Sequence, residues 1–257
     1  MFDFSLLLSS LPQLLASLPI TLELFAAIVL TGICIGVPMA LVGLSDSRIL
    51  SGSVKFYIGA FRGTPALVQL FFIYYGFGQF SFIRHSMLWP VLRDPFMCAV
   101  LALGMNSGAY TARILMGALS AVPKGIVEAA QALGLSNTSI LVKIKAPIAI
   151  RISIPAYANE TILNLKATSL ASTVTIMELT GTSKLLVSET YAPYEIFVGA
   201  GLVYLAMTYI LAHFFKYLES FVGRKTGKLE TSVRPKRKNS ATALKAKDSG
   251  ETQAASH

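Results

Sequence analysis

Long apolar runs separated by short polar intervals make up most of the chain. Each run has roughly the 20 residues that an α-helix needs to cross the hydrocarbon core of a bilayer. The runs extend over about residues 22–44, 57–82, 96–119, 148–176 and 196–215. The pattern therefore predicts an all-α, polytopic membrane protein with about five transmembrane helices.

The composition supports a membrane location. Hydrophobic residues make up 54% of the chain and charged residues 14%, and the mean hydropathy is +0.62, far from the balance of a soluble domain. The net charge of +9 would also suit a nucleic-acid-binding protein. However, the basic residues crowd the polar intervals and the final stretch, where the positive charge of cytoplasmic loops already explains them. No nucleic-acid partner is expected.

The charges also predict how the chain crosses the membrane. No Lys or Arg precedes Arg48, so the basic start of a cleaved signal peptide is missing, and the N-terminus is expected outside without processing. The interval 177–195 is net acidic and includes Glu178, which suits the outer side, whereas the basic end of the chain places the C-terminus inside. We expect a periplasmic segment at 1–18, a transmembrane domain at 19–223, and a disordered cytoplasmic tail at 224–257.

The polar interval 122–147 has the marks of a short helix at the membrane surface. Pro123 favours the start of a helix, and Gly134 favours its end in a left-handed conformation. Ile126, Ala130 and Leu133 fall on one face at helical spacing, so the segment is amphipathic. It is too short to cross a bilayer and is expected to lie along its surface.

This interval resembles the loop signature of the membrane subunits of bacterial ABC importers. The family pattern is Glu-Ala-Ala, three residues, Gly, nine residues, then Ile-x-Leu-Pro, and only Ala146 departs from it here. The matching positions are Glu128, Ala129, Ala130, Gly134, Ile144 and Pro147. The resemblance implies a coupling helix that docks in a groove of the ATP-hydrolysing subunit, and the alternative is an ordinary amphipathic surface helix.

The second apolar run contains a sequence that resembles the R-G-T-P-x-L-V-Q signature of the polar amino-acid branch of these permeases. A break at Gly63, followed by Thr64 as N-cap, would let a helix begin again inside the run. We expect Arg62 to extend to the cytoplasmic headgroups and not to contact substrate. Gln69 is a candidate for the substrate pathway, because a buried amide needs a partner inside the helix bundle.

The third run carries a polar stripe of Asn106, Tyr110, Arg113 and Gly117 at helical spacing. Such a stripe faces protein or water and not lipid. The family commonly has Glu at the position of Arg113 and Arg at that of Met116, so no ion pair is carried over. Arg113 either lines the pathway or reaches the cytoplasmic headgroups.

The fourth run carries a longer polar stripe, made of Ser153, Tyr157, Glu160, Asn164 and Thr168. A carboxylate in the middle of a membrane helix costs about 3 kcal/mol, so it needs a partner or a purpose. The surrounding sequence resembles the corresponding segment of permeases for basic amino acids and opines. We therefore predict that Glu160 receives a cationic group of the substrate, with Tyr157, Asn164 and Thr168 beside it.

The alternative for Glu160 is a structural ion pair. Arg151 and Arg113 are the candidate partners, and Lys166 is a poor one because six residues place it on another face of the helix.

Other motifs support neither an enzyme nor a cofactor site in this chain. The run that begins at Gly223 has the wrong spacing for a phosphate-binding loop, so ATP and its Mg²⁺ are expected on separate subunits. Cys34 and Cys98 are expected to be free, buried thiols, and no metal ligands stand at a suitable spacing. No catalytic residues are predicted.

The resemblance as a whole implies the permease subunit of a type I ABC importer of the histidine, arginine, glutamine and opine branch, in the bacterial inner membrane. It would pair with itself or a sister permease, bind two ATP-binding cassette subunits, and receive a basic amino acid or opine from a periplasmic binding protein. Two alternatives stand beside it. One is an ion- or proton-coupled secondary transporter with Glu160 as coupling carboxylate, and the other is a membrane scaffold without transport.

Overall fold

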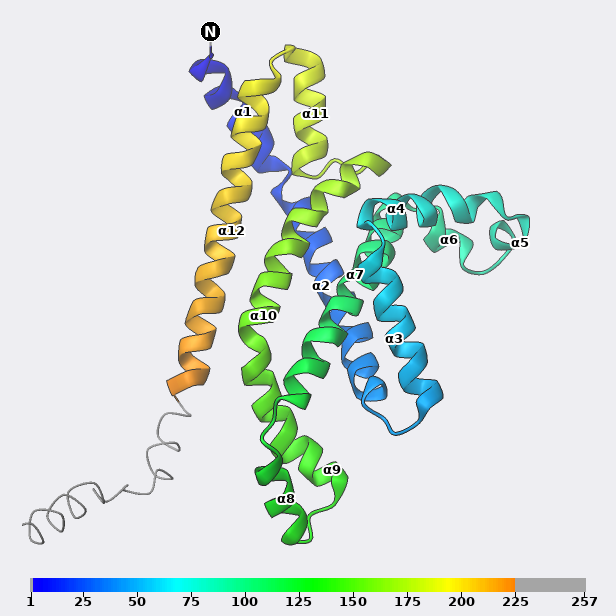
Figure 1. Ribbon diagram of the computed structural model, residues 1–257. Coiled ribbons are helices and arrows are strands. Elements are labelled where there is room, and N and C mark those ends of the chain that lie inside the picture. The colour runs from blue at the N-terminus through cyan, green and yellow to red at the C-terminus, as the bar shows by residue number, and fades with distance from the viewer. Residues whose placement is uncertain (1, 225–257) are drawn as a thin grey trace, which may run out of the picture. The chain divides into compact units, whose positions relative to one another are not determined.

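The computed structural model of the protein describes residues 2–224, and all regular elements in this range are helical (Figure 1). Residues up to Glu219 form one compact unit, to which the following description refers. The long elements occupy the five predicted apolar runs, and they are α2 (Leu18–Gly43), α3 (Arg48–Gly63) with α4 (Ala66–Phe71), α7 (Pro95–Ser120), α10 (Ala146–Ala167) and α12 (Pro193–Arg224). The predicted all-α class is confirmed, and the predicted tail lies outside the described residues.

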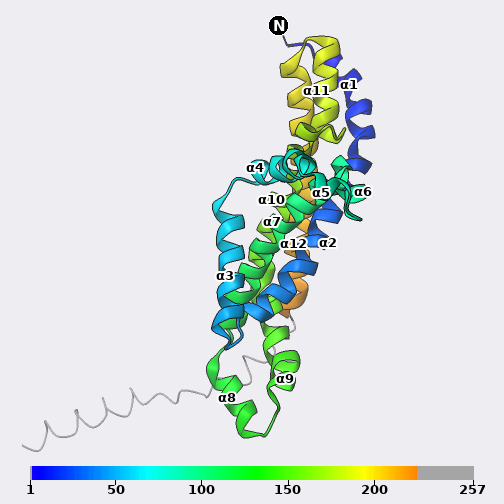
Figure 2. The same ribbon diagram turned by 90° about the vertical axis from the view of Figure 1, so that its right-hand side faces the viewer.

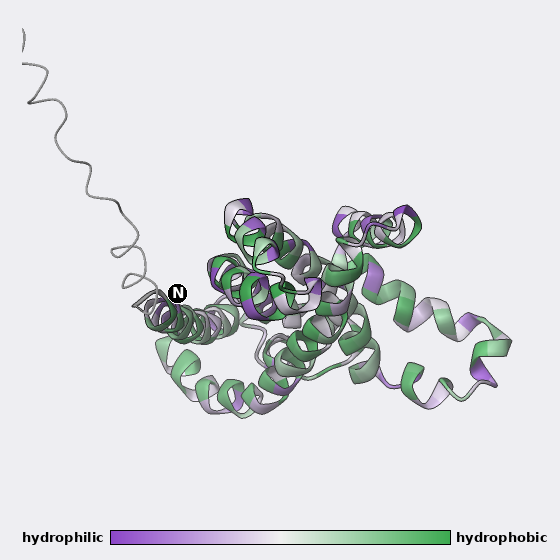
Figure 3. Ribbon diagram, turned by 90° about the horizontal axis from the view of Figure 1, so that it is seen from below, coloured by the Kyte–Doolittle hydropathy of each residue, from purple (hydrophilic) through white to green (hydrophobic). Residues whose placement is uncertain are grey.

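The long helices differ in how apolar they are. Within the described range, only Leu18–Gly43 and Pro193–Val222 are long and apolar enough to span a bilayer as single helices by composition alone. The α7 and α10 helices have the necessary length but carry the two polar stripes, which lowers their apolar content. Figure 3 shows hydrophobic residues along most of the long helices, interrupted by hydrophilic ones.

The second run is one bent pair of helices and not a straight span. Helix α3 ends at Gly63, and α4 begins at Ala66 after a bend of 103°. The predicted break is confirmed, but Thr64 does not cap the new helix. Its hydroxyl donates a hydrogen bond of 2.8 Å to the carbonyl of Ala60 instead, and Pro65 holds the N-cap position.

Beyond α4 the chain makes an arm that leaves the bundle sideways (Figure 1). A π-helix follows directly on α4, and two four-residue helices lead to the start of α7. The elements of the arm are η1 (Phe72–Gly76), η2 (Phe77–Gln79), α5 (Ser81–Arg84) and α6 (Trp89–Leu92).

Helices α2 and α7 make the most extensive contact in the unit. Gly32 and Gly36 of α2 lie directly against α7, where a Cβ added at Gly36 would come within 2.6 Å of the Cβ of Thr111. Small residues one turn apart allow this close approach, as in many membrane helix pairs. Cys98 is buried as predicted, but Cys34 lies on the outward face of α2 and is exposed, so that part of the prediction is wrong.

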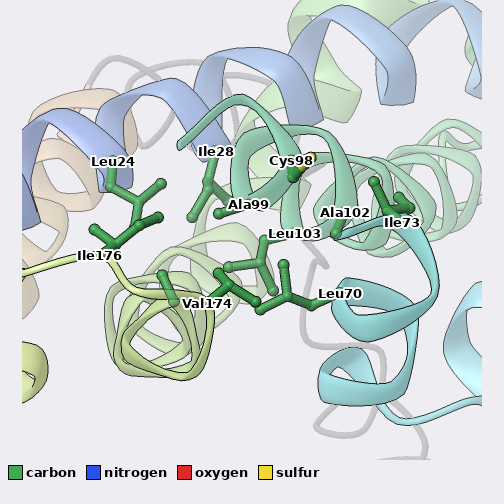
Figure 4. Packing of buried hydrophobic residues seen from close by; sticks show 11 residues of the cluster. Leu24, Ile28, Leu70, Ile73, Cys98, Ala99, Ala102, Leu103, Val174 and Ile176 are labelled. Atoms are coloured by element: carbon green, nitrogen blue, oxygen red, sulfur yellow. The ribbon is translucent and has the colours of Figure 1, made fainter. Parts of the chain in front are cut away.

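A cluster of buried apolar side chains joins α2, α4 and α7 to the end of the fourth run (Figure 4). Leu24 and Ile28 of α2 meet Leu103 of α7 in this cluster, and Val174 comes from the 3₁₀ helix η4 (Thr168–Val174) that continues α10. The fourth run is therefore an α-helix only as far as Ala167.

A second apolar cluster joins α1 (Phe4–Ala16), α11 (Leu179–Thr190) and the first half of α12. Glu178, which stands in the net acidic interval, caps the start of α11 and is fully buried. Two backbone N–H groups and the Tyr204 hydroxyl donate hydrogen bonds to its carboxylate, which is what a buried carboxylate requires.

The interval 122–147 forms α8 (Lys124–Ala132), α9 (Asn137–Ile140) and the π-helix η3 (Leu141–Lys145). Two views at right angles place α8 and α9 at the end of the unit opposite α1 and α11 (Figures 1 and 2). The turn between α2 and α3 lies toward the same end as α8. The turn between α2 and α3 and the interval 122–147 therefore share one end of the unit.

Candidate functional site

The polar stripe of α10 faces α7. The amide of Asn164 donates a hydrogen bond of 2.8 Å to the hydroxyl of Ser107, and it also hydrogen-bonds to the carboxylate of Glu160 one turn away. Both α10 side chains are buried, with 5% of Glu160 and 6% of Asn164 exposed. The predicted neighbours Glu160 and Asn164 are thus brought together, inside the protein.

Arg62 approaches the same place from α3. Its guanidinium carbon lies 5.0 Å from the ring centroid of Tyr110 in α7, and its positive charge is close enough to attract the carboxylate of Glu160. Arg62 is therefore a cation that acts on Glu160, and sequence reasoning had not proposed it as a partner.

The position of Arg62 in α3 bears on its expected extension to the cytoplasmic headgroups. Arg62 lies in the last turn of α3, whereas Arg48 begins that helix directly after the turn that follows α2. Their separation corresponds to about 21 Å of helix, farther than an arginine side chain extends. If the turn before Arg48 lies on the inner side, as the charges predict, Arg62 would lie too far from the inner headgroups to reach them.

Gln69 makes a second group of polar contacts, at the bend between α3 and α4. Its amide nitrogen donates to the carbonyl of Phe61 at 2.9 Å and to that of Thr64 at 3.1 Å. Its amide oxygen accepts a hydrogen bond of 2.9 Å from Asn106 of α7. These bonds satisfy carbonyls that the helix break leaves free, so Gln69 holds the bend against α7.

The remaining residues of the two stripes point to different surroundings. Thr168 is fully buried and donates to the carbonyl of Leu165, while the ring of Tyr157 packs at 6.4 Å against Phe215 of α12. Arg113 is exposed on α7. Glu160 and Asn164 thus form a buried polar pair that faces α7. Tyr157 and Thr168 lie on the same helical stripe but contact other surroundings.

The α8 segment has the geometry of a capped surface helix. Gly134 has a positive φ of 75°, and the N–H groups of Gly134 and Leu135 donate to the carbonyls of Gln131 and Ala130. This is the predicted helix end. The helix starts at Lys124 with Pro123 as its N-cap, also as predicted.

The apolar side chains of α8 divide between an inner and an outer face. Ala130 is buried, and Val127 packs against the cluster formed by the end of α7 and the start of α10. Ile126 is 45% exposed and Leu133 82% exposed, so these two form an outward apolar surface. The remaining signature positions Glu128, Ala129 and Pro147 are exposed, and Ile144 is half-buried. This end of the protein therefore exposes apolar and signature residues of α8 together.

Among residues 2–224, no group of His, Cys, Asp or Glu side chains could hold a metal ion. The charged groups of this site are the buried carboxylate of Glu160 and the exposed guanidinium of Arg62. Such a site can bind a charged ligand by direct contacts, and it contains no obvious nucleophile paired with a base.

Comparison with known proteins gives a consistent picture. Residues 32–224 match the family described as the inner membrane component of binding-protein-dependent transport systems. An octopine transport permease of Rhizobium meliloti is 45% identical over 85% of this chain and 89% of its own length. A nopaline transport permease of Agrobacterium fabrum is 45% identical over 82% of this chain and 88% of its own length. An arginine ABC transporter permease of Escherichia coli K12 is 38% identical over 81% and 94%.

Two solved structures share the fold. The crystal structure of an amino acid ABC transporter with histidines has a TM-score of 0.77 and 30% identity, covering 86% of this chain and 99% of that one. An inward-facing structure of a methionine ABC transporter has a TM-score of 0.67 at 18% identity, covering 79% of this chain and 92% of that one, and supports the fold alone.

Proposed function

The chain belongs to the family of inner membrane components of binding-protein-dependent transport systems, and from this premise we propose that it is the permease subunit of an ABC importer for a basic amino acid or an opine. The named relatives transport octopine, nopaline and arginine. Arginine carries a guanidinium group, and octopine and nopaline are arginine derivatives that retain it. Membership of this family speaks against the ion-coupled secondary transporter and against a scaffold without transport.

One observation carries the proposal for the substrate. Glu160 is a buried carboxylate on a membrane helix, and its neighbours are the amide of Asn164 and the charge of Arg62. An ionisable group in this setting marks a functional site by default. We propose that Glu160 receives the cationic group of the substrate, which would displace Arg62 from the carboxylate during transport.

The roles of the neighbouring polar residues follow from their positions. Asn164 orients the carboxylate of Glu160 through its hydrogen bond, and Tyr157 and Thr168 extend the pathway toward α12. Gln69 keeps the bend of α3 and α4 in place beside Arg62. Arg113, exposed on α7, would meet the additional carboxylate that an opine substrate carries.

Energy for transport would come from partner subunits. We propose that α8 docks on an ATP-binding cassette subunit through the apolar surface of Ile126 and Leu133, and that ATP and Mg²⁺ are bound there. The complete importer would contain two such subunits, a second permease (another copy or a sister chain) and a periplasmic binding protein. The N-terminus would lie outside and the α8 end inside.

Uptake by the reconstituted importer tests this function. Arginine or octopine should accumulate in proteoliposomes only when the ATPase subunits, ATP and the binding protein are all supplied. Uptake driven by an imposed proton or sodium gradient without the ATPase would contradict the proposal and favour the secondary transporter.

A further inference from the structure

A cavity of about 330 Å³ lies between α10, η4 and α12. It is separate from the centre at Glu160, because Glu160 and Asn164 face α7. The cavity is near the lower end of the size range of small-molecule sites. Its lining residues are Lys166, Ser169, Gly201, Tyr204, Leu205 and Thr208.

Lys166 gives this cavity a positive charge. It is the only charged residue in the lining, and its side chain is exposed. A cation on a membrane helix faces water or protein and not lipid. The ammonium group offers three hydrogen-bond donors and no acceptor, so its natural ligand is an anion.

Thr208 adds a hydroxyl group to the cavity lining. Its oxygen is buried and has no hydrogen-bond partner among the described residues. Buried polar groups are nearly always paired, so an unpaired one on a cavity wall calls for an explanation. Gly201 in the same wall has open space where a Cβ would be, which leaves room for a ligand beside Thr208.

Glu178 is hydrogen-bonded to a residue of this wall, but other groups satisfy its carboxylate. Tyr204 lines the cavity, and its hydroxyl donates a 2.8 Å hydrogen bond to the carboxylate of Glu178. That carboxylate also accepts bonds from two backbone N–H groups, and the cation that acts on it is Lys184 of α11. The hydrogen-bonding and charge requirements of the Glu178 carboxylate are therefore met by groups other than Lys166.

We propose that this cavity binds the carboxylate of the transported amino acid, with Lys166 as its counter-ion and Thr208 as a hydrogen-bond donor. The inference rests on the proposed function and adds a second charged binding site for the substrate. Glu160 serves the cationic end of the substrate on the α7 side of α10, and Lys166 serves the anionic end on the α12 side. The importer would therefore select amino acids with a free carboxylate over the corresponding amines.

The test compares arginine with agmatine, which is arginine without its carboxylate. Binding of each compound to the purified complex of permease and ATPase subunits is measured by calorimetry in the absence of the binding protein. Lys166→Gln should weaken arginine binding about tenfold and leave agmatine binding unchanged. Lys216→Gln changes an exposed lysine of α12 outside the cavity and serves as the control.

Thr208→Val provides a second variant, because it keeps the volume of the side chain and removes only the unpaired hydroxyl. It should also weaken arginine binding selectively, by several-fold. Lys166→Arg keeps the charge and should retain most of the affinity for arginine. Unchanged arginine binding in both Lys166→Gln and Thr208→Val would overturn the inference while leaving the proposed function intact.

Two other outcomes are also decisive. An anionic lipid in the cavity would make Lys166→Gln alter the amount of co-purified phospholipid without altering arginine binding, and that result overturns the role in substrate binding. If the unaltered complex bound neither compound and also failed to take up arginine or octopine in proteoliposomes, the proposed function itself would fail.

Discussion

The guanidinium carbon of Arg62 lies 5.0 Å from the ring centroid of Tyr110, which ties the last turn of α3 to the middle of α7. The positive charge of the same guanidinium also acts on the carboxylate of Glu160 on α10. Arg62 thus connects three helices directly before the bend at Gly63. A substrate cation that binds Glu160 would weaken the attraction between Arg62 and the carboxylate. Because Arg62 belongs to α3 and contacts Tyr110, this change would affect both α3 and α7.

The contact between Arg62 and Tyr110 should be measurable as a coupling energy. In a double-mutant cycle with Arg62→Gln and Tyr110→Leu, the two effects on the free energy of unfolding should be non-additive by about 0.5–1 kcal/mol. The measurement is denaturation of the purified permease in mixed detergent. Lys55→Gln, which changes an exposed cation of α3, replaces Arg62→Gln in the control cycle and should be additive with Tyr110→Leu. Additivity in both cycles would mean that the ring contact contributes nothing.

Glu160→Gln should abolish most uptake of a cationic substrate while the importer still assembles. The amide keeps the size of the side chain and its hydrogen bond with Asn164, but it lacks the charge that attracts a guanidinium. Uptake of labelled arginine or octopine into proteoliposomes gives the rate, and basal ATP hydrolysis of the same complex shows whether assembly is intact. Normal uptake by this variant would remove Glu160 from the substrate pathway.

Gln69→Leu should destabilise the permease by about 1–3 kcal/mol, because the carbonyls of Phe61 and Thr64 lose a donor at the bend. Thermal unfolding of the purified protein measures this change. Gln79→Leu alters an exposed glutamine of the arm and should stay within about 0.5 kcal/mol of the unaltered protein. Equal stability of the two variants would show that the hydrogen bonds of Gln69 do not hold the bend.

Gly134→Val should weaken attachment of the ATPase subunits without affecting membrane insertion. The φ of 75° at Gly134 is strained for a β-branched residue, by about 1–3 kcal/mol, so the end of α8 would rearrange. The amount of ATPase that co-purifies with the permease reports the effect. Gly125→Ala is the matched control, because Gly125 has an ordinary φ and open space around it. Undiminished co-purification of Gly134→Val would count against α8 as the docking helix.

Features set by local sequence were predictable. The five apolar runs fixed the long helices, Pro123 and Gly134 fixed α8, and the break at Gly63 was visible from its own residues. Helical spacing also placed Glu160 and Asn164 on one face, where the structure confirms that they meet.

Features that depend on distant residues were not predictable in the same way. The bend of α3 and α4 is held by Asn106, which is 37 residues from Gln69 along the chain. Glu178 stands in a polar interval, and its partner Tyr204 is 26 residues away along the chain. No local pattern reveals such a pairing, since it arises only when α11 and α12 pack together.

The most direct test of the account is ATP hydrolysis by the reconstituted importer when binding proteins loaded with arginine, octopine or glutamine are added. The account predicts that binding protein carrying a cationic ligand stimulates hydrolysis, and that Glu160→Gln abolishes the coupled uptake of that ligand. Stimulation and uptake with glutamine alone would contradict a cationic substrate, and the absence of any complex with ATPase subunits would contradict the permease assignment of this chain.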